Sequence, residues 1–427
     1  MGNPRSSSAG RHSTEQGFGD GPLIPAKVAL LAACCAASVA NVYYAQPLLD
    51  AIARDFRITH ADVGGVITAT QFGCAIALLF VVPLGDLLDR KRLILLQLIL
   101  LVLSCIGVAM SSSPWMLLAA MVCVGLLGTA MTQGLIAYAA TLAAPAERGR
   151  VVGAAQGGVV IGLLLARTLA GCVADVAGWR AVYFMSACIA VVMLVALLRR
   201  LPASNAPRAQ LAYGALLRSM GSLLLHEKTL QIRGMLAMLM FAAFGIFWSA
   251  LVLPLSAAPW SMSHTEIGAF GLVGAMGALA AARAGRLTDR GYGQITTFVA
   301  LVMLLAAWAP LFFTTRSIPL LIVGIVLLDV GGSAIHVVNQ SMIFNARPEL
   351  HARLVGCYML FYSVGSGLGA IASTSIYARS GWGGVCALGA GVSLLALVFW
   401  AVTVRRGAHS ASDDLPDRQI VDVEHIR

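Results

Sequence analysis

The chain has 427 residues, of which 59% are hydrophobic and only 11% charged, with a formal net charge of +10. Soluble domains carry roughly 25% charged residues, so this chain has too few to cover a water-facing surface. Its basic residues lie in short segments between apolar runs, which argues against a nucleic-acid-binding face. The composition therefore excludes ordinary soluble domains and predicts a membrane protein.

Long apolar runs recur along the whole chain. A spanning helix needs about 20 apolar residues, and backbone polar groups in lipid must be satisfied within a helix or a closed barrel. The runs lack the alternation of a barrel, so we expect an all-α membrane protein. Twelve transmembrane helices are predicted, at residues 27–48, 62–84, 93–111, 115–143, 151–175, 181–199, 233–256, 266–284, 295–314, 319–345, 353–377 and 382–404.

The distribution of Lys and Arg predicts the orientation. With the N-terminus inside, 23 basic residues fall in inner segments, five in outer loops, and Arg167 inside a span. Cytoplasmic segments carry such an excess, so we expect both termini to be cytoplasmic in an inner-membrane protein. The predicted organisation is a disordered cytoplasmic tail, a six-helix half, a cytoplasmic central loop, a second six-helix half and a cytoplasmic C-terminal tail, at residues 1–26, 27–199, 200–232, 233–404 and 405–427.

The two halves repeat one another. Gly85-Asp86-Leu87-Leu88-Asp89-Arg90 recurs 200 residues later as Gly285-Arg286-Leu287-Thr288-Asp289-Arg290. Internal repeats are typical of secondary transporters, in which two pseudo-symmetric halves rock about a central site. The loop residues Gly85, Asp86, Asp89, Arg90, Gly285, Asp289 and Arg290 are therefore candidates for a conformational switch, with an ordinary positive-inside loop as the alternative. Gly153-x-x-x-Gly157 and Gly365-x-x-x-Gly369 predict close helix packing.

The loop motif at Gly85, Leu87, Asp89 and Arg90 resembles the signature of the major facilitator superfamily. Segments 41–47, 165–171 and 178–180 resemble a bacterial branch grouped near purine-nucleoside, sugar and drug efflux pumps. The resemblance covers about residues 27–404 and implies a secondary transporter, with export as the expected direction. The antiporter signature of the fifth span is matched at Gly158 and Gly162 but not at Leu163 or Ala166.

Ionisable groups within spans are costly and mark candidate functional sites. Arg167 and Asp329 lie at similar predicted depths, and we expect them to interact directly or through the cavity, or each to be satisfied separately. Asp329, Ser333, His336 and Gln340 share one helical stripe with Asn339 beside it, which predicts a face on the pathway. Asp329 and His336 are the candidate proton carriers. Further pathway candidates on other spans are Asn41, Tyr44, Gln46, Gln133, Gln156, Trp248 and Tyr362.

Other classes of protein are less well supported. Metalloprotease, Gly-x-Ser-x-Gly and Walker-type motifs are absent from the sequence, so we expect no enzyme, no cofactor, no metal and no direct use of ATP. The expected partners are a small-molecule substrate, protons and the lipid bilayer, for a monomeric protein. An importer or facilitator of the same fold remains the main alternative, and a channel or sensor is the alternative from another class.

Overall fold

The computed structural model describes residues 25–144, 146–200, 212–346 and 350–413, which form helices and no β-strand. The first half is helical almost throughout. Helix-favouring apolar runs end where Gly, Pro or a polar cap interrupts them; for example, Asp89 caps the helix at Arg90 by accepting from the Arg92 amide at 2.8 Å. Its elements are α1 (Pro25–Tyr43), η1 (Gln46–Leu48), α2 (Leu49–Phe56), α3 (Gly65–Ile76), η2 (Ala77–Val81), η3 (Val82–Asp86), α4 (Arg90–Ala109), α5 (Pro114–Leu142), α6 (Arg148–Ala177) and α7 (Trp179–Arg200).

The second half follows a short linking helix, α8 (Tyr213–His226). This helix lies within the segment 200–232 that the sequence predicted as a loop, and residues 201–211 of that loop lie outside the described residues. The elements of the second half are α9 (Lys228–Ala250), α10 (Val252–Ser256), α11 (His264–Val273), α12 (Ala275–Leu287), η4 (Thr288–Tyr292), α13 (Gly293–Ala306), α14 (Trp308–Phe312), α15 (Ile318–Ala346) and α16 (His351–Asp413).

Within the described ranges, ten helical segments are long and apolar enough to cross a membrane. Two of them, His264–Phe312 with 49 residues and Arg353–Arg405 with 53, are about twice the length that one crossing needs. Each contains one glycine with positive φ, Gly291 at 89° and Gly381 at 60°, where the helix direction changes. We therefore assign two crossings to each, and the predicted all-helical fold is confirmed.

The two predicted tails lie only partly within the described residues. The tail predicted as disordered, 1–26, falls outside the described residues except for its last two positions, which begin α1. The tail predicted at 405–427 starts as the last turns of α16, which ends at Asp413. Large apolar side chains are exposed on the outside of the bundle, among them Leu103, Val192 and Leu395. Such a surface would be a liability in water and suits contact with lipid.

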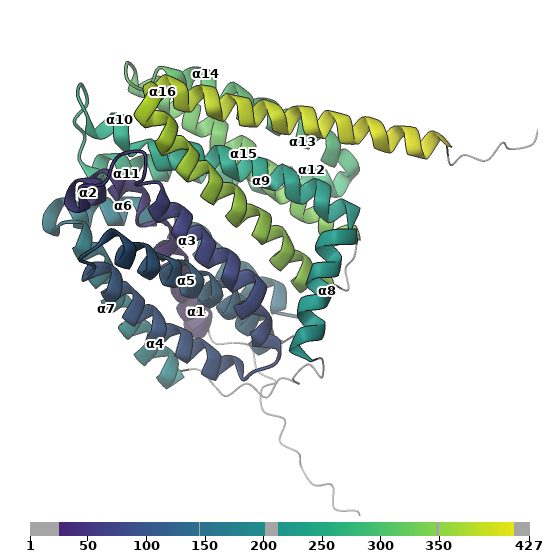
Figure 1. The fold of residues 1–427 in the computed structure, drawn as a ribbon. Helices are drawn as coiled ribbons and strands as arrows, with labels where there is room; N and C mark the ends of the chain where they lie inside the picture. Colours follow the sequence, from purple (N-terminus) through teal and green to yellow (C-terminus); the bar gives the residue numbers. More distant parts are fainter. Residues whose placement is uncertain (1–24, 145, 201–211, 347–349, 414–427) are drawn as a thin grey trace, which may run out of the picture.

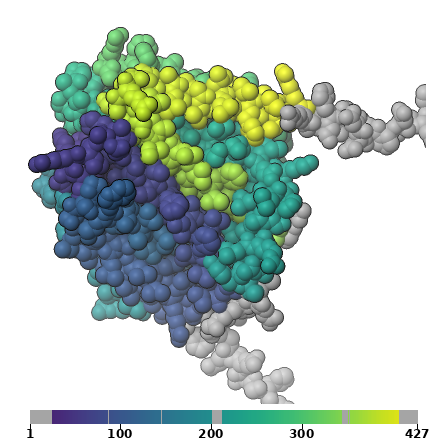
Figure 2. All heavy atoms as spheres, viewed as in Figure 1, coloured from purple at the N-terminus to yellow at the C-terminus, as the bar shows by residue number. Residues whose placement is uncertain are grey.

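The two halves lie side by side (Figure 1), and Figure 2 shows the purple-to-blue half packed directly against the teal-to-yellow half. They meet mainly where α6 packs on α11 and where α3 packs on the first part of α16. We call the end that carries the Gly85–Arg90 and Gly285–Arg290 loops the motif end. The end that carries α2 and α10 is the opposite end.

The two copies of the loop motif differ in structure. In the first copy, Arg90 donates from Nε to the Gly85 carbonyl at 2.9 Å and from Nη1 to the Ala137 carbonyl of α5 at 3.0 Å. These bonds attach the loop to a helix of the same half. In the second copy, Asp289 and Arg290 are exposed and lie in the π-helical turn η4. The backbone of Asp86 lies in η3, while its side chain is outside the described part.

One of the two predicted glycine contacts is confirmed. A Cβ atom at Gly365 or Gly369 would come within 2.1 Å or 2.3 Å of a carbonyl oxygen on α9, so α16 and α9 pack backbone to backbone there. The other prediction is wrong, because a Cβ at Gly153 or Gly157 would meet nothing within 4 Å. The packing face of α6 is instead formed by the next pair of glycines in the helix, Gly158 and Gly162, which lie against α1.

This difference gives a paired test. We expect Gly365→Ala to lower the thermal unfolding midpoint of the purified protein, because forcing atoms into a packed contact costs about 1–3 kcal/mol. Gly153→Ala should leave the midpoint unchanged or raise it slightly, since it adds a methyl group in open space and alanine favours the helix. Equal midpoints for the two variants in detergent would contradict the assigned packing.

Candidate functional site

Arg167 lies deep in the bundle, on α6 of the first half. Its side chain is only 6% exposed. Its Nε donates a hydrogen bond to Oε1 of Gln46 at 2.7 Å. Gln46 begins η1, where α1 has ended and the chain turns, so its amide projects from the break between two helices. A predicted pair of pathway residues from two different spans is thus in direct contact.

Two aromatic rings lie close to the guanidinium group of Arg167. Its Cζ atom lies 4.1 Å from the ring centre of Trp248 on α9 and 5.3 Å from that of Tyr43 on α1. A cation over an aromatic face is stabilised by the ring quadrupole, more so where water is excluded. Tyr43 in turn shares a 2.6 Å hydroxyl–hydroxyl hydrogen bond with Tyr362 on α16. Because Trp248 and Tyr362 belong to the second half, this cluster joins the halves.

Asp329 is close to this cluster without forming an ion pair in it. The residue is 6% exposed, and its buried Oδ2 has no hydrogen-bond partner among the described residues. Among the ion pairs of the described residues, none joins a nitrogen of Arg167 to a carboxylate oxygen of Asp329 within 4.0 Å. A Cβ at Gly271 would be 3.3 Å from Cδ of Arg167, and one at Gly274 would be 3.0 Å from Oδ2 of Asp329. The break between α11 and α12 thus borders both side chains.

The other residues of the predicted polar stripe on α15 contact different helices. Ser333 faces α12, with its Oγ 2.7 Å from the position of a Cβ on Gly277. His336 is hydrogen-bonded through Nδ1 to the Tyr358 hydroxyl at 3.0 Å and lies edge-on to Phe241. Asn339 accepts a long bond of 3.5 Å from Arg233 on α9. Gln340 is half-buried.

Several other candidates lie away from Arg167. Asn41 accepts from Ser186 on α7 at 2.6 Å and donates to the carbonyl of Ala37 at 2.9 Å, so it connects helices inside the first half. Tyr44 is 2% exposed in the hydrophobic core. Gln133 is half-buried and Gln156 is exposed. The structure therefore brings together Gln46, Arg167, Trp248, Asp329 and Tyr362 and leaves the others around them.

Sequence reasoning missed Tyr43 and Phe241. Tyr43 is the last residue of α1, and the chain turns directly after it, so counting in helical steps selected its neighbour Tyr44. Phe241 packs its ring 4.3 Å from that of Tyr362 at nearly a right angle. An aromatic residue in an apolar span gives no signal of its own in the sequence, because most such residues only fill the core.

A second polar cluster, also missed, connects the halves at the opposite end. The carboxylate of Asp175, at the end of α6, accepts from the backbone amides of His264 and Thr265 at 3.0 Å and 2.8 Å, and from the Thr265 hydroxyl at 2.6 Å. Negative charge is favourable at a helix N-terminus. A residue of the first half thus caps α11 of the second half.

His264 extends this cluster to α2. Its Nδ1 lies 2.9 Å from Asp175, and its Nε2 lies 3.0 Å from Oδ1 of Asp50. Ionised carboxylates only accept hydrogen bonds, so both contacts are satisfied together when both ring nitrogens carry a proton. We call Asp50, Asp175, His264 and Thr265 the opposite-end cluster. It holds the halves together on that side.

We expect Asp175→Ala to open this end. The variant loses a cap and charge-assisted hydrogen bonds, each worth about 1.5–3 kcal/mol, so the closed arrangement should lose at least roughly tenfold in population. Hydrogen–deuterium exchange of the peptide around residues 261–270 should accelerate accordingly. Asp62→Ala is the control, because the carboxylate of Asp62 accepts from the Thr59 hydroxyl at 2.6 Å within its own turn. Unchanged exchange in Asp175→Ala would rule out this function of the cluster.

Comparison with known proteins identifies the family. The model of the Major Facilitator Superfamily matches residues 28–252 and 234–425. The chain belongs to the Major Facilitator Superfamily. The uncharacterized transporter YgaY of Escherichia coli is 39% identical over 378 residues, covering 88% of this chain and 95% of YgaY. The purine ribonucleoside efflux pump NepI of Shigella sonnei is 27% identical over 172 residues, 40% of this chain and 43% of the pump.

Solved structures agree in fold. A bacterial homolog of the human lysosomal transporter Spinster, in an inward-facing and unoccupied conformation, superposes with a TM-score of 0.70 at 16% identity, over 89% of this chain and 97% of that chain. This superfamily member is therefore a multi-pass membrane transporter and not an enzyme, as the sequence predicted.

Proposed function

We propose that this transporter exports a small organic solute across the cytoplasmic membrane by alternating access, in exchange for protons. The observation that carries the proposal is the Arg167 cluster, in which a cation of the first half is stacked at 4.1 Å on Trp248 of the second half. Any rocking of one half against the other must change this contact. A substrate that binds there is therefore coupled to the movement.

The packing of α6 supports such a movement. At the opposite end a Cβ on Gly171 or Gly268 would lie 2.1 Å or 2.3 Å from backbone of the other half. At the motif end, a Cβ on Gly153 or Gly157, which belong to α6 as Gly171 does, would meet nothing within 4 Å. This asymmetry is that of one alternating-access state, closed at the opposite end. Because the segments that the sequence predicts as inner carry 23 basic residues and include both motif loops, we assign the motif end to the cytoplasm.

The chemistry of the cluster suggests the class of substrate. Trp248, Tyr43 and Tyr362 offer ring faces, while Arg167 and Asp329 offer one positive and one titratable group. A neutral polar or zwitterionic molecule with a planar ring would use all of these. The name of NepI, a purine ribonucleoside efflux pump, agrees with that class and with export. An importer or facilitator of the same fold is the alternative, and we propose a monomer as the working unit.

Two linked experiments test the proposal. In an untargeted comparison of culture media, at least one solute should accumulate outside an overexpressing strain and be depleted outside a deletion strain. In proteoliposomes, flux of that solute should saturate with concentration and collapse when a protonophore is added. Inward accumulation would favour the importer. Flux that neither saturates nor responds to the protonophore would indicate a pore.

A further inference from the structure

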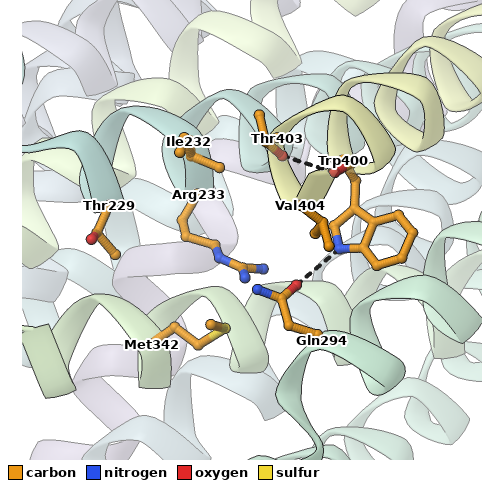
Figure 3. Close-up of a pocket in the computed structure, with 8 residues that line it drawn as sticks. All are labelled: Thr229, Ile232, Arg233, Gln294, Met342, Trp400, Thr403 and Val404. Atoms are coloured by element: carbon orange, nitrogen blue, oxygen red, sulfur yellow. Dashed lines mark hydrogen bonds between the residues drawn. The ribbon is translucent and has the colours of Figure 1, made fainter. Parts of the chain in front are cut away.

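A separate cavity of about 320 Å³ lies within the second half at the motif end. It is bordered by α9, α13, α15 and α16, and Figure 3 shows the side chains that line it. The walls are mixed: Ile232, Met342 and Val404 are apolar, whereas Arg233 and Gln294 are polar. All of these residues belong to one half, so the cavity is distinct from the Arg167 cluster, which joins the two halves.

Arg233 is a buried cation without an anionic partner. It is 4% exposed, and its hydrogen bonds run from Nη1 alone, to the Thr297 hydroxyl at 3.2 Å and to Oδ1 of Asn339 at 3.5 Å. Both acceptors are neutral. Among the described residues no carboxylate forms an ion pair with Arg233, and its Nε and Nη2 donors have no protein acceptor. An uncompensated buried charge costs several kcal/mol, which a bound anion would offset.

Gln294 presents a second donor to the same space. Its Oε1 accepts from the indole Nε1 of Trp400 at 3.0 Å. Because an indole N–H can only donate, this bond fixes which end of the amide faces Trp400. The amide nitrogen therefore points the other way, toward the guanidinium of Arg233, as Figure 3 shows. Two donors face one another, and the described residues place no acceptor between them. An acceptor placed between them satisfies both donors, and an anion there would also offset the charge of Arg233.

We propose that this cavity binds a phosphate group between Arg233 and Gln294. Guanidinium donors match tetrahedral oxyanions through paired N–H bonds, and the cavity has the size of a small-ligand site. Arg233 lies five residues into α9, roughly 8 Å from its first residue, which is the depth of a membrane interface. The phosphate therefore comes either from a soluble cytoplasmic anion or from an anionic phospholipid of the adjacent leaflet. Both present the same chemistry to the site.

Thermal unfolding of the purified, delipidated full chain in a neutral detergent tests the proposal and separates the two sources. One titration uses sodium phosphate against sodium chloride at equal ionic strength. The other uses dioctanoyl phosphatidylglycerol against dioctanoylglycerol, which lacks the phosphate. A ligand that binds only the folded state raises the midpoint in a saturable manner. Neither readout depends on transport, on its direction or on proton coupling.

Three variants locate the site. Arg233→Gln should raise the apparent dissociation constant at least tenfold. Gln294→Glu should do the same and should also raise the midpoint without any added anion, because its carboxylate takes the place of the phosphate while still accepting from Trp400. Arg218→Gln, which removes an exposed charge on α8, should bind as the wild type does.

The outcomes assign the source or reject the site. Saturable stabilisation by inorganic phosphate that Gln294→Glu abolishes supports a soluble anion. The same pattern with phosphatidylglycerol alone supports a lipid headgroup. The proposal is overturned if neither probe stabilises the wild type, or if Gln294→Glu responds as the wild type does. Gln294 is exposed, so this variant decides the matter even where Arg233→Gln does not fold.

Discussion

Replacing Arg167 with Ala is expected to reduce substrate flux by about a hundredfold or more. The change removes the cation that lies over the rings of Trp248 and Tyr43 and its bond to Gln46, and it takes away a positive charge close to the buried Asp329. Removing one partner from a buried charged arrangement costs about 3–5 kcal/mol. Arg167→Lys should fall between the wild type and Ala, because an ammonium group keeps the charge but not the planar stacking. The measurement is the initial rate in proteoliposomes, normalised to folded protein.

The matched control is Arg180→Ala. Arg180 also stacks on a tryptophan, with its Cζ 4.4 Å from the ring centre of Trp179, and it pairs with Asp55. These contacts lie within the first half and do not involve the second, so flux should stay within a few-fold of the wild type. If both variants lose activity to the same degree, the loss at Arg167 reflects folding and not the pathway.

A charge swap addresses the relation between Arg167 and Asp329. The double variant Arg167→Asp with Asp329→Arg is expected to be inactive. Trp248 and Gln46 stabilise a cation at position 167, and an aspartate there would face the electron-rich surface of the indole. Recovery of transport in the double variant would instead show that the two side chains pair directly at some stage of the cycle.

The sequence predicted the fold class and part of the site for clear reasons. Apolar runs and the 200-residue repeat are local patterns, and they specify helices and two related halves. An ionisable residue inside a span is costly, and Arg167 and Asp329 are candidates for this reason. Trp248 was a candidate because it is near the middle of a span. Its stacking on Arg167 could not be inferred, since 81 residues separate the two in the chain.

The misses have a physical cause as well. Residue spacing predicts which side chains share a helix face only while the helix continues. Because α1 ends at Tyr43, the directions of the Tyr44 and Gln46 side chains no longer follow that spacing. Asn41 and Asn339 are polar residues in spans, yet each bonds to a residue of its own half, Asn41 to Ser186 and Asn339 to Arg233. The Nδ2 of Asn339 has no hydrogen-bond partner among the described residues. The opposite-end cluster joins Asp50 and His264, which are 214 positions apart. Such contacts arise only when the halves pack, and one sequence carries no signal for them.

Asp329→Asn should uncouple transport from the proton gradient. The buried Oδ2 of Asp329 has no partner in the described part of the protein, where a proton, a water molecule or a cationic group of the substrate would satisfy it. Asparagine keeps the size and polarity of the side chain but cannot exchange a proton. We therefore expect gradient-driven accumulation to be lost almost entirely, while exchange of labelled for unlabelled substrate across the membrane stays within about tenfold of the wild type.

His336 is the second candidate for the proton carrier in the proposed exchange, and its variant separates the two possibilities. His336 is already bonded to Tyr358 at 3.0 Å and lies edge-on to Phe241, so we expect His336→Gln to lower the rate but to preserve the response to a protonophore. Ser333→Ala, one helical turn from Asp329, controls for disturbance of the stripe. If Asp329→Asn still accumulates substrate against a gradient and His336→Gln does not, the proton is carried by His336. In that case the unpartnered carboxyl group serves to bind the substrate.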